Sequence, residues 1–171
     1  MTNSSEKYEE AVTPTSGDAV EWLVRLRKLA GCGGAFSTLG FEVTEGGIGA
    51  AAVAVTLDGR HTNFFGSCHG GVIFALADSA LGLAANSYGA AAVAIDAHIT
   101  FSSAAREGNR LIARATEIRR GRTVAVYRVD VRNVTDRGAE IVSTFTGTVF
   151  IRGAQPRRPG ASDADSARVP S

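Results

Sequence analysis

The sequence predicts an α+β protein in which a curved antiparallel β-sheet wraps around one long central helix. Three observations lead to this fold class. Residues 68–89 contain a helical segment that is apolar on every face, with a single carboxylate in its middle. Residues 92–101 alternate between apolar and polar side chains, as a half-buried strand does. The prolines all lie outside residues 17–153, as expected of a domain built from continuous helix and strand.

Length and composition fit one globular domain. The chain has 171 residues, of which 44% are apolar and 20% are charged, and this is enough for a domain with its own core. We expect the domain to cover residues 17–153, between a flexible N-terminal segment at 1–16 and a disordered tail at 154–171. The tail is rich in proline, serine and charged residues, a composition that does not bury a core.

Charge and cysteine content exclude several classes of protein. The net charge of +1 creates no overall field that favours nucleic acid or a membrane surface. Cys32 and Cys68 are too few for a disulfide framework, and the polar, acidic N-terminus is unlike a secretory signal. The longest apolar run, residues 71–85, is shorter than the roughly 20 residues of a membrane-spanning helix. We therefore expect a cytoplasmic protein with no nucleic acid and no membrane among its partners.

The first part of the domain predicts a helix and a β-hairpin. Residues 18–29 repeat apolar side chains with the helical period, with Asp18 as the N-cap and Gly31 as the stop. The segment Glu45-Gly46-Gly47 suits the turn of a hairpin. The two strands that it joins are expected at 39–44 and 48–57.

The second part of the domain predicts a series of long strands. Turn-like breaks separate them, and we expect them at 92–101, 110–119, 123–132 and 140–151. In the first of these strands one face is expected to carry Val93, Ile95, Ala97, Ile99 and Phe101. A sheet covers only one side of a helix, whereas the central helix has no polar side to leave in water. A second copy of the chain is expected to cover the other side, which makes the protein a dimer.

The central segment also carries groups suited to chemistry. A helix start presents unpaired N–H groups and positive dipole character, so the amides at His69-Gly70-Gly71 can hold a carbonyl oxygen that gains negative charge. Asp78 lies in apolar surroundings, where a carboxylate is costly unless it is paired, hydrogen-bonded or used. Together they indicate an amide that activates an electrophile and a base or nucleophile, the parts that acyl transfer needs.

These residues and the order of the elements resemble a known family. The pattern is Asn63-x5-His69-Gly70-Gly71-x6-Asp78. It resembles the hotdog-fold acyl-CoA thioesterases of the phenylacetic-acid-degradation (PaaI-like) group, over about residues 35–152. Features that support the resemblance are Asp96 with Ile99-Thr100-Phe101, Gly121-Arg122-Thr123, and Gly147 with Thr148.

The resemblance implies a hydrolase that cleaves acyl-CoA thioesters as a homodimer or, more specifically, a homotetramer. It implies that Asp78 is the general base or nucleophile and that the Gly70 amide polarises the thioester carbonyl. Asn63 and His69 then orient the carbonyl or the attacking water. The turn with Arg120, Gly121, Arg122 and Thr123 lies near the nucleotide of CoA. No metal and no organic cofactor is implied.

Helix geometry bears on where such a site can lie. Gly70 and Asp78 are eight residues apart, which is about 12 Å along one helix axis. One thioester carbon cannot touch both groups within a chain. Two antiparallel copies of the helix across a two-fold axis would bring Gly70 of one chain beside Asp78 of the other, so we expect two shared active sites per dimer.

Each of these residues also has a structural interpretation. Asp78 can be a helix carboxylate bonded to a neighbouring hydroxyl or amide, His69 can cap the helix, the glycines can permit a tight turn, and Asn63 can be a turn residue. A Cys68–His69 nucleophile pair is disfavoured because adjacent residues seldom point at each other. His61, Cys68 and His69 lack the spacing of a zinc site.

The acyl group is expected in a slot between subunits near Phe64, Phe65, Leu76, Leu81 and Phe101. The small residues Ala75, Ala77 and Ala80 leave room for a ring, which favours an aryl or arylacetyl group of the phenylacetyl-CoA type. Two alternatives stay open: an acyl-CoA hydratase or dehydratase on the same fold, and a non-catalytic acyl-CoA sensor. Release of free CoA thiol separates the three.

Overall fold

The computed structural model describes residues 16–152, so the expected tail at 154–171 and nearly all of the expected N-terminal segment lie outside the described residues. The elements are α1 (Ser16–Ala30), α2 (Gly34–Thr38), β1 (Glu42–Gly47), β2 (Ala50–Thr56), η1 (Gly59–His61), α3 (Gly70–Asn86), β3 (Ala92–Phe101), β4 (Arg110–Arg120), β5 (Val124–Thr135) and β6 (Gly138–Ile151). All the expected helices and strands are present. The short helix α2 and the 3₁₀ turn η1 were not expected.

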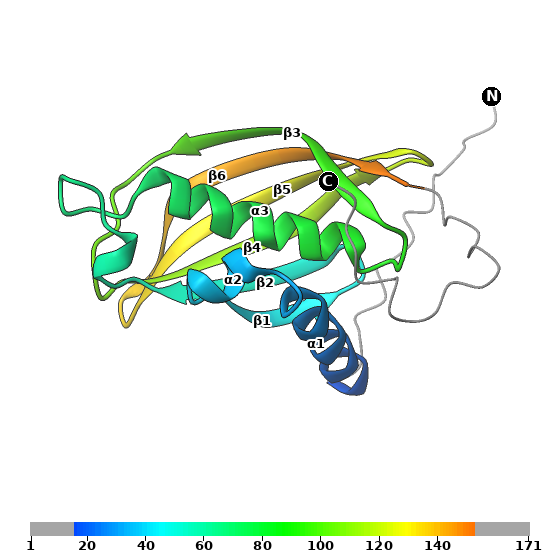
Figure 1. Cartoon of the computed structure of the whole chain (residues 1–171), viewed down its shortest axis with the longest axis horizontal. Helices are drawn as coiled ribbons and strands as arrows, with labels where there is room; N and C mark the ends of the chain where they lie inside the picture. Colours follow the sequence, from blue (N-terminus) through cyan, green and yellow to red (C-terminus); the bar gives the residue numbers. More distant parts are fainter. Residues whose placement is uncertain (1–15, 153–171) are drawn as a thin grey trace, which may run out of the picture.

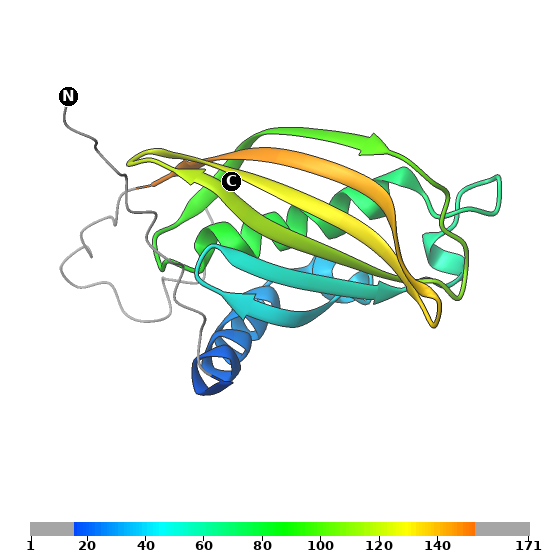
Figure 2. The same cartoon turned by 180° about the vertical axis from the view of Figure 1, so that it is seen from behind.

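The strands form one antiparallel sheet that curves around α3. Its order is β1-β2-β4-β5-β6-β3, so β1 and β3 are the two edge strands. Figure 1 shows α3 lying along the concave face of the sheet, and Figure 2 shows the convex face from behind. The predicted fold class, a curved antiparallel sheet around one central helix, is confirmed.

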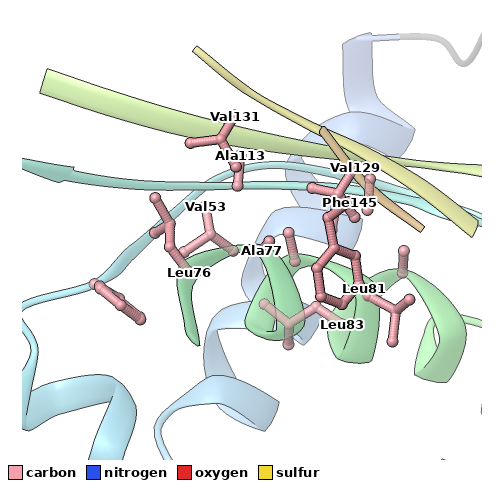
Figure 3. Close-up of a cluster of buried hydrophobic side chains, with 14 of the residues drawn as sticks. Val53, Leu76, Ala77, Leu81, Leu83, Ala113, Val129, Val131 and Phe145 are labelled. Atoms are coloured by element: carbon pink, nitrogen blue, oxygen red, sulfur yellow. The ribbon is translucent and has the colours of Figure 1, made fainter. Parts of the chain in front are cut away.

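The core forms where α3 meets the inner face of the sheet. Leu76, Ala77 and Leu81 of the helix are at most 1% exposed. They meet side chains of β2, β4, β5 and β6 in one layer (Figure 3). Fully burying one leucine side chain stabilises a fold by about 1.5–3 kcal/mol, so this contact fixes α3 along the sheet.

One stripe of α3 has no cover within the described chain. Gly71, Ala75, Asp78, Gly82 and Asn86 recur every three or four residues and are all at least partly exposed, whereas the opposite side of the helix is buried. This spacing puts them on one helical face. The sheet therefore covers one side of the helix, as the sequence predicted, and leaves the stripe with Asp78 open.

Two predicted boundaries were wrong. The hairpin turns at Ile48-Gly49, because Gly47 pairs with Ala50 and Gly49 takes a φ of +69°, which suits glycine. The segment 45–47 instead belongs to β1. Helix α1 begins at Ser16, two residues before the expected N-cap, so Asp18 lies inside its first turn.

The expected apolar face of β3 was also only partly right. A bulge interrupts the register: Ala94 pairs with Val149 and Asp96 pairs with Thr148, which leaves Ile95 as the extra residue. Ala94 and Ala97 therefore point to the same side of the sheet, and Val93 points to the other. Unbroken alternation, on which the prediction relied, does not continue across a bulge.

Gly147 of β6 shows how closely α3 approaches the sheet. A Cβ at this position would overlap Leu81 Cδ1 and lie 3.0 Å from Phe145 Cε1, and both side chains are buried. We expect Gly147→Ala to lower the free energy of unfolding by about 1–3 kcal/mol, the usual cost of overpacking a core. Urea unfolding followed by circular dichroism measures the change.

Gly47→Ala is the matched control, because it also lies in a strand and no atom outside its immediate chain neighbours comes within 4 Å of the added Cβ. It should leave the midpoint of unfolding unchanged or raise it slightly, since alanine loses less backbone entropy than glycine. Equal stability of the two variants would show that the helix does not pack on the sheet as closely as described.

Candidate active site

The loop before α3 fixes the start of the helix. The backbone N–H of His69 donates to the carbonyl of His61 (2.8 Å), and Thr62 and Cys68 form an isolated antiparallel bridge. His69 is the N-cap, and its Nδ1 accepts a hydrogen bond from the N–H of Gly71 (2.9 Å). Because Nδ1 accepts, the ring proton of a neutral His69 lies on Nε2. The capping interpretation of His69 is thus correct, and it leaves one N–H of the ring free to donate.

Gly71 and Gly70 are glycines for steric reasons. A Cβ at Gly71 would lie 3.0 Å from Nδ1 of His69, so a larger residue would push the capping ring away. A Cβ at Gly70 would lie 3.1 Å from Cζ of Phe101. The absence of both side chains lets the imidazole and the phenyl ring close around the first turn of α3.

The amide of Gly70 is available to a ligand. Within residues 16–152, no acceptor lies within hydrogen-bonding distance of its N–H. Gly70 also forms part of the wall of a hollow of about 310 Å³, which is lined by Cys68, Gly70, Ile73, Phe101 and residues 102–105. A free N–H at the positive end of a helix, beside an open hollow, can hold an oxygen that gains negative charge.

Asp78 has no stabilising partner among residues 16–152. It lies in the middle of α3 on the open stripe and is partly exposed, and no hydrogen bond or ion pair to its carboxylate is present in the described part of the chain. Burial raises the pKa of Asp78 above its ordinary value. The structural interpretation, a carboxylate bonded to a nearby hydroxyl or amide, therefore finds no partner in the part of the chain that the structure describes.

Asn63 serves the loop that precedes the site. Its Oδ1 accepts from the N–H groups of Phe65 (2.9 Å) and Ser67 (3.3 Å), and its Nδ2 donates to Ser67 Oγ (3.1 Å). The turn interpretation of Asn63 fits these bonds. A role of Asn63 in orienting a carbonyl or water stays a prediction.

The turn between β4 and β5 lies at the other end of the molecule. In Figure 1 it is at the right of the sheet, whereas α3 begins at the left. The predicted nucleotide-binding segment, Arg120 to Thr123, is therefore remote from Gly70 of the same chain. Its two arginines also differ: Arg122 is exposed and has no ion pair among the described residues, while the Arg120 side chain is only 18% exposed.

Arg120 is held in a polar cluster that the sequence did not reveal. Its guanidinium donates to Tyr127 Oη (3.2 Å) and lies 3.7 Å from the ring centroid of Tyr88. Tyr127 and Tyr88 both donate to Glu117, at 2.6 and 3.1 Å. Burial, and the hydrogen bond to Glu117, raise the pKa of Tyr127. Glu117 lies on the face of β4 that carries the buried Leu111, Ala113 and Ala115, and a glutamate at that position is a signal that could have indicated the cluster.

Some residues expected around the acyl group belong to the core instead. Leu76, Leu81, Ala77 and Ala80 are at most 1% exposed and pack against the sheet. They face the sheet because they occupy the side of α3 opposite the open stripe. Those that do remain accessible are Phe101 at 50%, Phe64 at 90%, Phe65 at 78%, and Ala75.

The remaining nucleophile and ligand candidates do not form a site. Cys68 is buried, and this burial raises its pKa to about 11, so its thiol stays protonated at neutral pH. Both ring nitrogens of His61 are hydrogen-bonded. No group of three or more His, Cys, Asp or Glu residues in the described chain is arranged to hold a metal ion. None of the described helices is long and apolar enough to cross a membrane.

Comparison with known proteins identifies similar sequences. A sequence profile of the thioesterase superfamily matches residues 65–140. A candidate esterase of Deinococcus radiodurans is 42% identical over 117 residues, which are 68% of this chain and 78% of that protein. The acyl-coenzyme A thioesterase PaaI of Escherichia coli is 37% identical over 95 residues, which are 56% of this chain and 68% of PaaI.

Solved structures agree with the sequence matches. The structure of E. coli PaaI, from the phenylacetic acid degradation operon, aligns with a TM-score of 0.73 and 29% identity, and covers 80% of this chain and 96% of PaaI. A protein of Streptococcus mutans, bound to acetyl-CoA, aligns with a TM-score of 0.62 and 29% identity, and covers 66% of this chain and 89% of that one.

The environments of the two cysteines predict different reactivity. Cys32 is exposed and Cys68 is buried with a pKa of about 11, so at pH 8 only about one Cys68 in a thousand is a thiolate. We expect one rapidly reacting thiol per native chain with a disulfide reagent, and two after denaturation.

The variant Cys32→Ser is the control and should react slowly until it is unfolded. If native Cys32→Ser instead reacts as fast as free cysteine, Cys68 is accessible as a thiolate and the nucleophile excluded above has to be reconsidered.

Proposed function

Since the chain belongs to the thioesterase superfamily as a PaaI-like hotdog thioester hydrolase, we propose that it hydrolyses aryl or arylacetyl esters of coenzyme A at a site shared by two copies. One observation carries the proposal. The free N–H of Gly70 and the unpaired carboxylate of Asp78 lie on the same helix, with no partner for either in the described chain. These are the two groups that thioester hydrolysis requires.

In the proposed reaction Asp78 takes a proton from water, and the resulting hydroxide adds to the thioester carbonyl carbon. The carbonyl oxygen becomes an oxyanion that accepts from the N–H of Gly70 and from Nε2–H of His69. When the intermediate collapses, the C–S bond breaks and the CoA sulfur takes the proton from Asp78. In the alternative route the Asp78 carboxylate attacks the carbon directly, the C–S bond breaks, and the CoA thiolate leaves and takes a proton from water. Water then cleaves the mixed anhydride to the free acid and restores the Asp78 carboxylate. Neither route needs a metal or an organic cofactor.

The site is proposed to join two chains. Gly70 and Asp78 are about 12 Å apart along the axis of α3, too far for one carbonyl group to touch both. The open stripe with Asp78 and the edge strand β3, on which Val93 and Ile95 are 46% and 59% exposed, provide two surfaces for a second copy. A two-fold axis would then place Gly70 of one chain near Asp78 of the partner. Assembly of such homodimers into a homotetramer is the further expectation.

The nucleotide of CoA is proposed to bind at the turn between β4 and β5. Coenzyme A carries phosphate groups, and an arginine side chain matches a phosphate with paired N–H donors. Arg122 is the exposed arginine of this turn, whereas Arg120 is held by Tyr127 and Glu117. Gly121 and Thr123 complete the segment. The S. mutans relative that binds acetyl-CoA supports a CoA ester as the ligand.

The acyl group is proposed to be aromatic. The open stripe of α3 consists largely of small residues, among them Gly71, Ala75 and Gly82, so a flat ring can approach the helix. Phe101 stands beside the helix start and can stack on such a ring. The relationship to PaaI, which comes from a phenylacetic acid degradation operon, supports an arylacetyl group. A cytoplasmic location stays a prediction.

The proposal is tested by measuring release of CoA thiol from a panel of acyl-CoA esters. We expect turnover, with the highest kcat/KM for phenylacetyl-CoA or a related aryl ester. Binding of acyl-CoA without thiol release would indicate a sensor. Addition or removal of water across an enoyl-CoA double bond, with the thioester intact, would indicate a hydratase or dehydratase. A clear preference for straight-chain esters would refute only the proposal that the acyl group is aromatic, and the proposed thioester hydrolysis would stand.

Asp78→Asn should lower turnover by at least about 100-fold, the low end of acid–base contributions. Burial raises the pKa of folded Asp78 above its unfolded value. The contribution of this shift to folding stability is fully present below the pKa that Asp78 has in the unfolded chain. It is lost as the pH rises through the higher pKa that Asp78 has in the folded chain. At neutral pH the ionised carboxylate therefore destabilises the fold, and Asp78→Asn should melt at the same or a higher temperature. Near wild-type turnover in this variant would remove Asp78 from the mechanism.

Mixing of inactive variants tests the shared site. Gly70→Val should displace the helix-start amide against Phe101, and Asp78→Asn removes the base. Heterodimers formed after reversible dissociation would hold one intact site, so random mixing should restore about one quarter of wild-type activity.

The control is a chain with both substitutions mixed with an equal amount of wild-type chain. If the site is shared, every heterodimer is inactive and about one quarter of the activity per chain remains; if each chain holds its own site, about half remains. Heterodimers that are confirmed by mass spectrometry and recover no activity in the first mixture would contradict the shared site.

A further inference from the structure

His61 is a fully buried polar side chain near the site, at 0% exposure. Both of its ring nitrogens have partners. Nδ1 accepts from the backbone N–H of Asp58 (3.0 Å), and Nε2 lies 2.9 Å from the carbonyl oxygen of Leu39. A carbonyl only accepts, so Nε2 carries a proton and donates it to Leu39. Nδ1 also lies 3.1 Å from a carboxylate oxygen of Asp58.

These bonds fasten the turn η1 to a distant part of the chain. Leu39 follows α2, 22 residues before His61. Arg60 connects the same two segments: its side chain donates to the carbonyl of Thr38 (3.2 Å) and to the carboxylate of Asp58 (2.9 Å). The capping box between Asp58 and His61 closes the turn itself. The backbone at His61 is therefore held from two directions.

The same residue reaches the start of α3 through its backbone. The carbonyl of His61 accepts from the N–H of His69 (2.8 Å). His69 is the N-cap of α3, and its own carbonyl accepts from the N–H of Val72 (2.9 Å). A continuous series of hydrogen bonds thus leads from Leu39 through His61 to His69, the residue before Gly70.

We propose that His61 is a positioning residue for the hydrolysis proposed above, on which this inference rests: its buried imidazole holds the loop that sets where the N–H of Gly70 points. An oxyanion donor stabilises the transition state only when it is aimed at the place where charge develops, and a displacement of about 1 Å can cost on the order of 100-fold in rate. His61 does not touch the substrate. It acts through the His69 amide.

Three variants separate the bonds of the ring. His61→Asn keeps an acceptor near the Nδ1 position, His61→Gln keeps a donor near the Nε2 position, and His61→Phe keeps ring volume but neither bond. Ser87→Ala is the matched control. Ser87 is also 0% exposed and accepts a buried hydrogen bond, from the N–H of Gly49 (2.8 Å), but at the opposite end of α3.

We expect His61→Phe to lower kcat at least about 10-fold with a KM within about two-fold of wild type, because the donor is used mainly in the transition state. The asparagine and glutamine variants should fall between His61→Phe and wild type. Ser87→Ala should lower Tm without lowering kcat. Hydrogen exchange should show faster exchange of the His69 amide in His61→Phe than in Ser87→Ala at equal loss of stability.

Two results would overturn the proposal: an unchanged kcat in the folded His61 variants, or an equal loss of kcat in His61→Phe and Ser87→Ala. If His61→Phe does not fold, the asparagine and glutamine variants decide by the same comparison. A wild-type protein that releases no CoA thiol would refute the proposed function. The exchange of the His69 amide would then still show whether His61 fixes the helix start.

Discussion

Helix α3 has 17 residues and, apart from Asp78, no charged side chain, and the rest of the structure follows from the need to cover it. Burial of its apolar surface is the dominant favourable contribution to folding. The six strands supply that cover on one side, and they curve because a flat sheet would touch only a narrow strip of the helix. Gly147 lets the helix approach closely at the point where Leu81 meets β6. The same geometry leaves the stripe with Asp78 uncovered, so this carboxylate lies on the side of the helix that faces away from the sheet.

Much of this arrangement can be predicted from the sequence. The uniform apolarity of α3 predicts that it is central, and the long alternating segments predict the antiparallel strands around it. The helix start at His69-Gly70-Gly71 is equally local information, because capping depends on residues a few positions apart. The structure adds what sequence spacing alone leaves open: the Gly71 amide is capped by His69, whereas that of Gly70 is left without an acceptor in residues 16–152.

Other features depend on contacts between distant segments, and the sequence does not reveal them. The bulge at Ile95 arises from pairing with β6 and changes which side chains face the helix. Leu76 and Leu81 were expected beside the substrate, but the rotation of α3 on the sheet places them in the core. Arg120 has a side chain suited to binding phosphate, but its guanidinium donates to the hydroxyl of Tyr127 instead. The same hydroxyl donates to Glu117, ten residues before Tyr127. In each case the decisive partner lies on another element of the fold.

The unpaired edge of β3 affects how readily a newly synthesised chain aggregates. Its backbone carries a row of N–H and C=O groups with no neighbour on one side within the described residues, and its apolar side chains Val93 and Ile95 are about half exposed. Such an edge is a template for any extended segment, including an unfolded neighbour on the ribosome. A specific partner that occupies the edge protects it and stabilises the folded chain by mass action, so resistance to aggregation becomes a function of how much of the protein the cell makes.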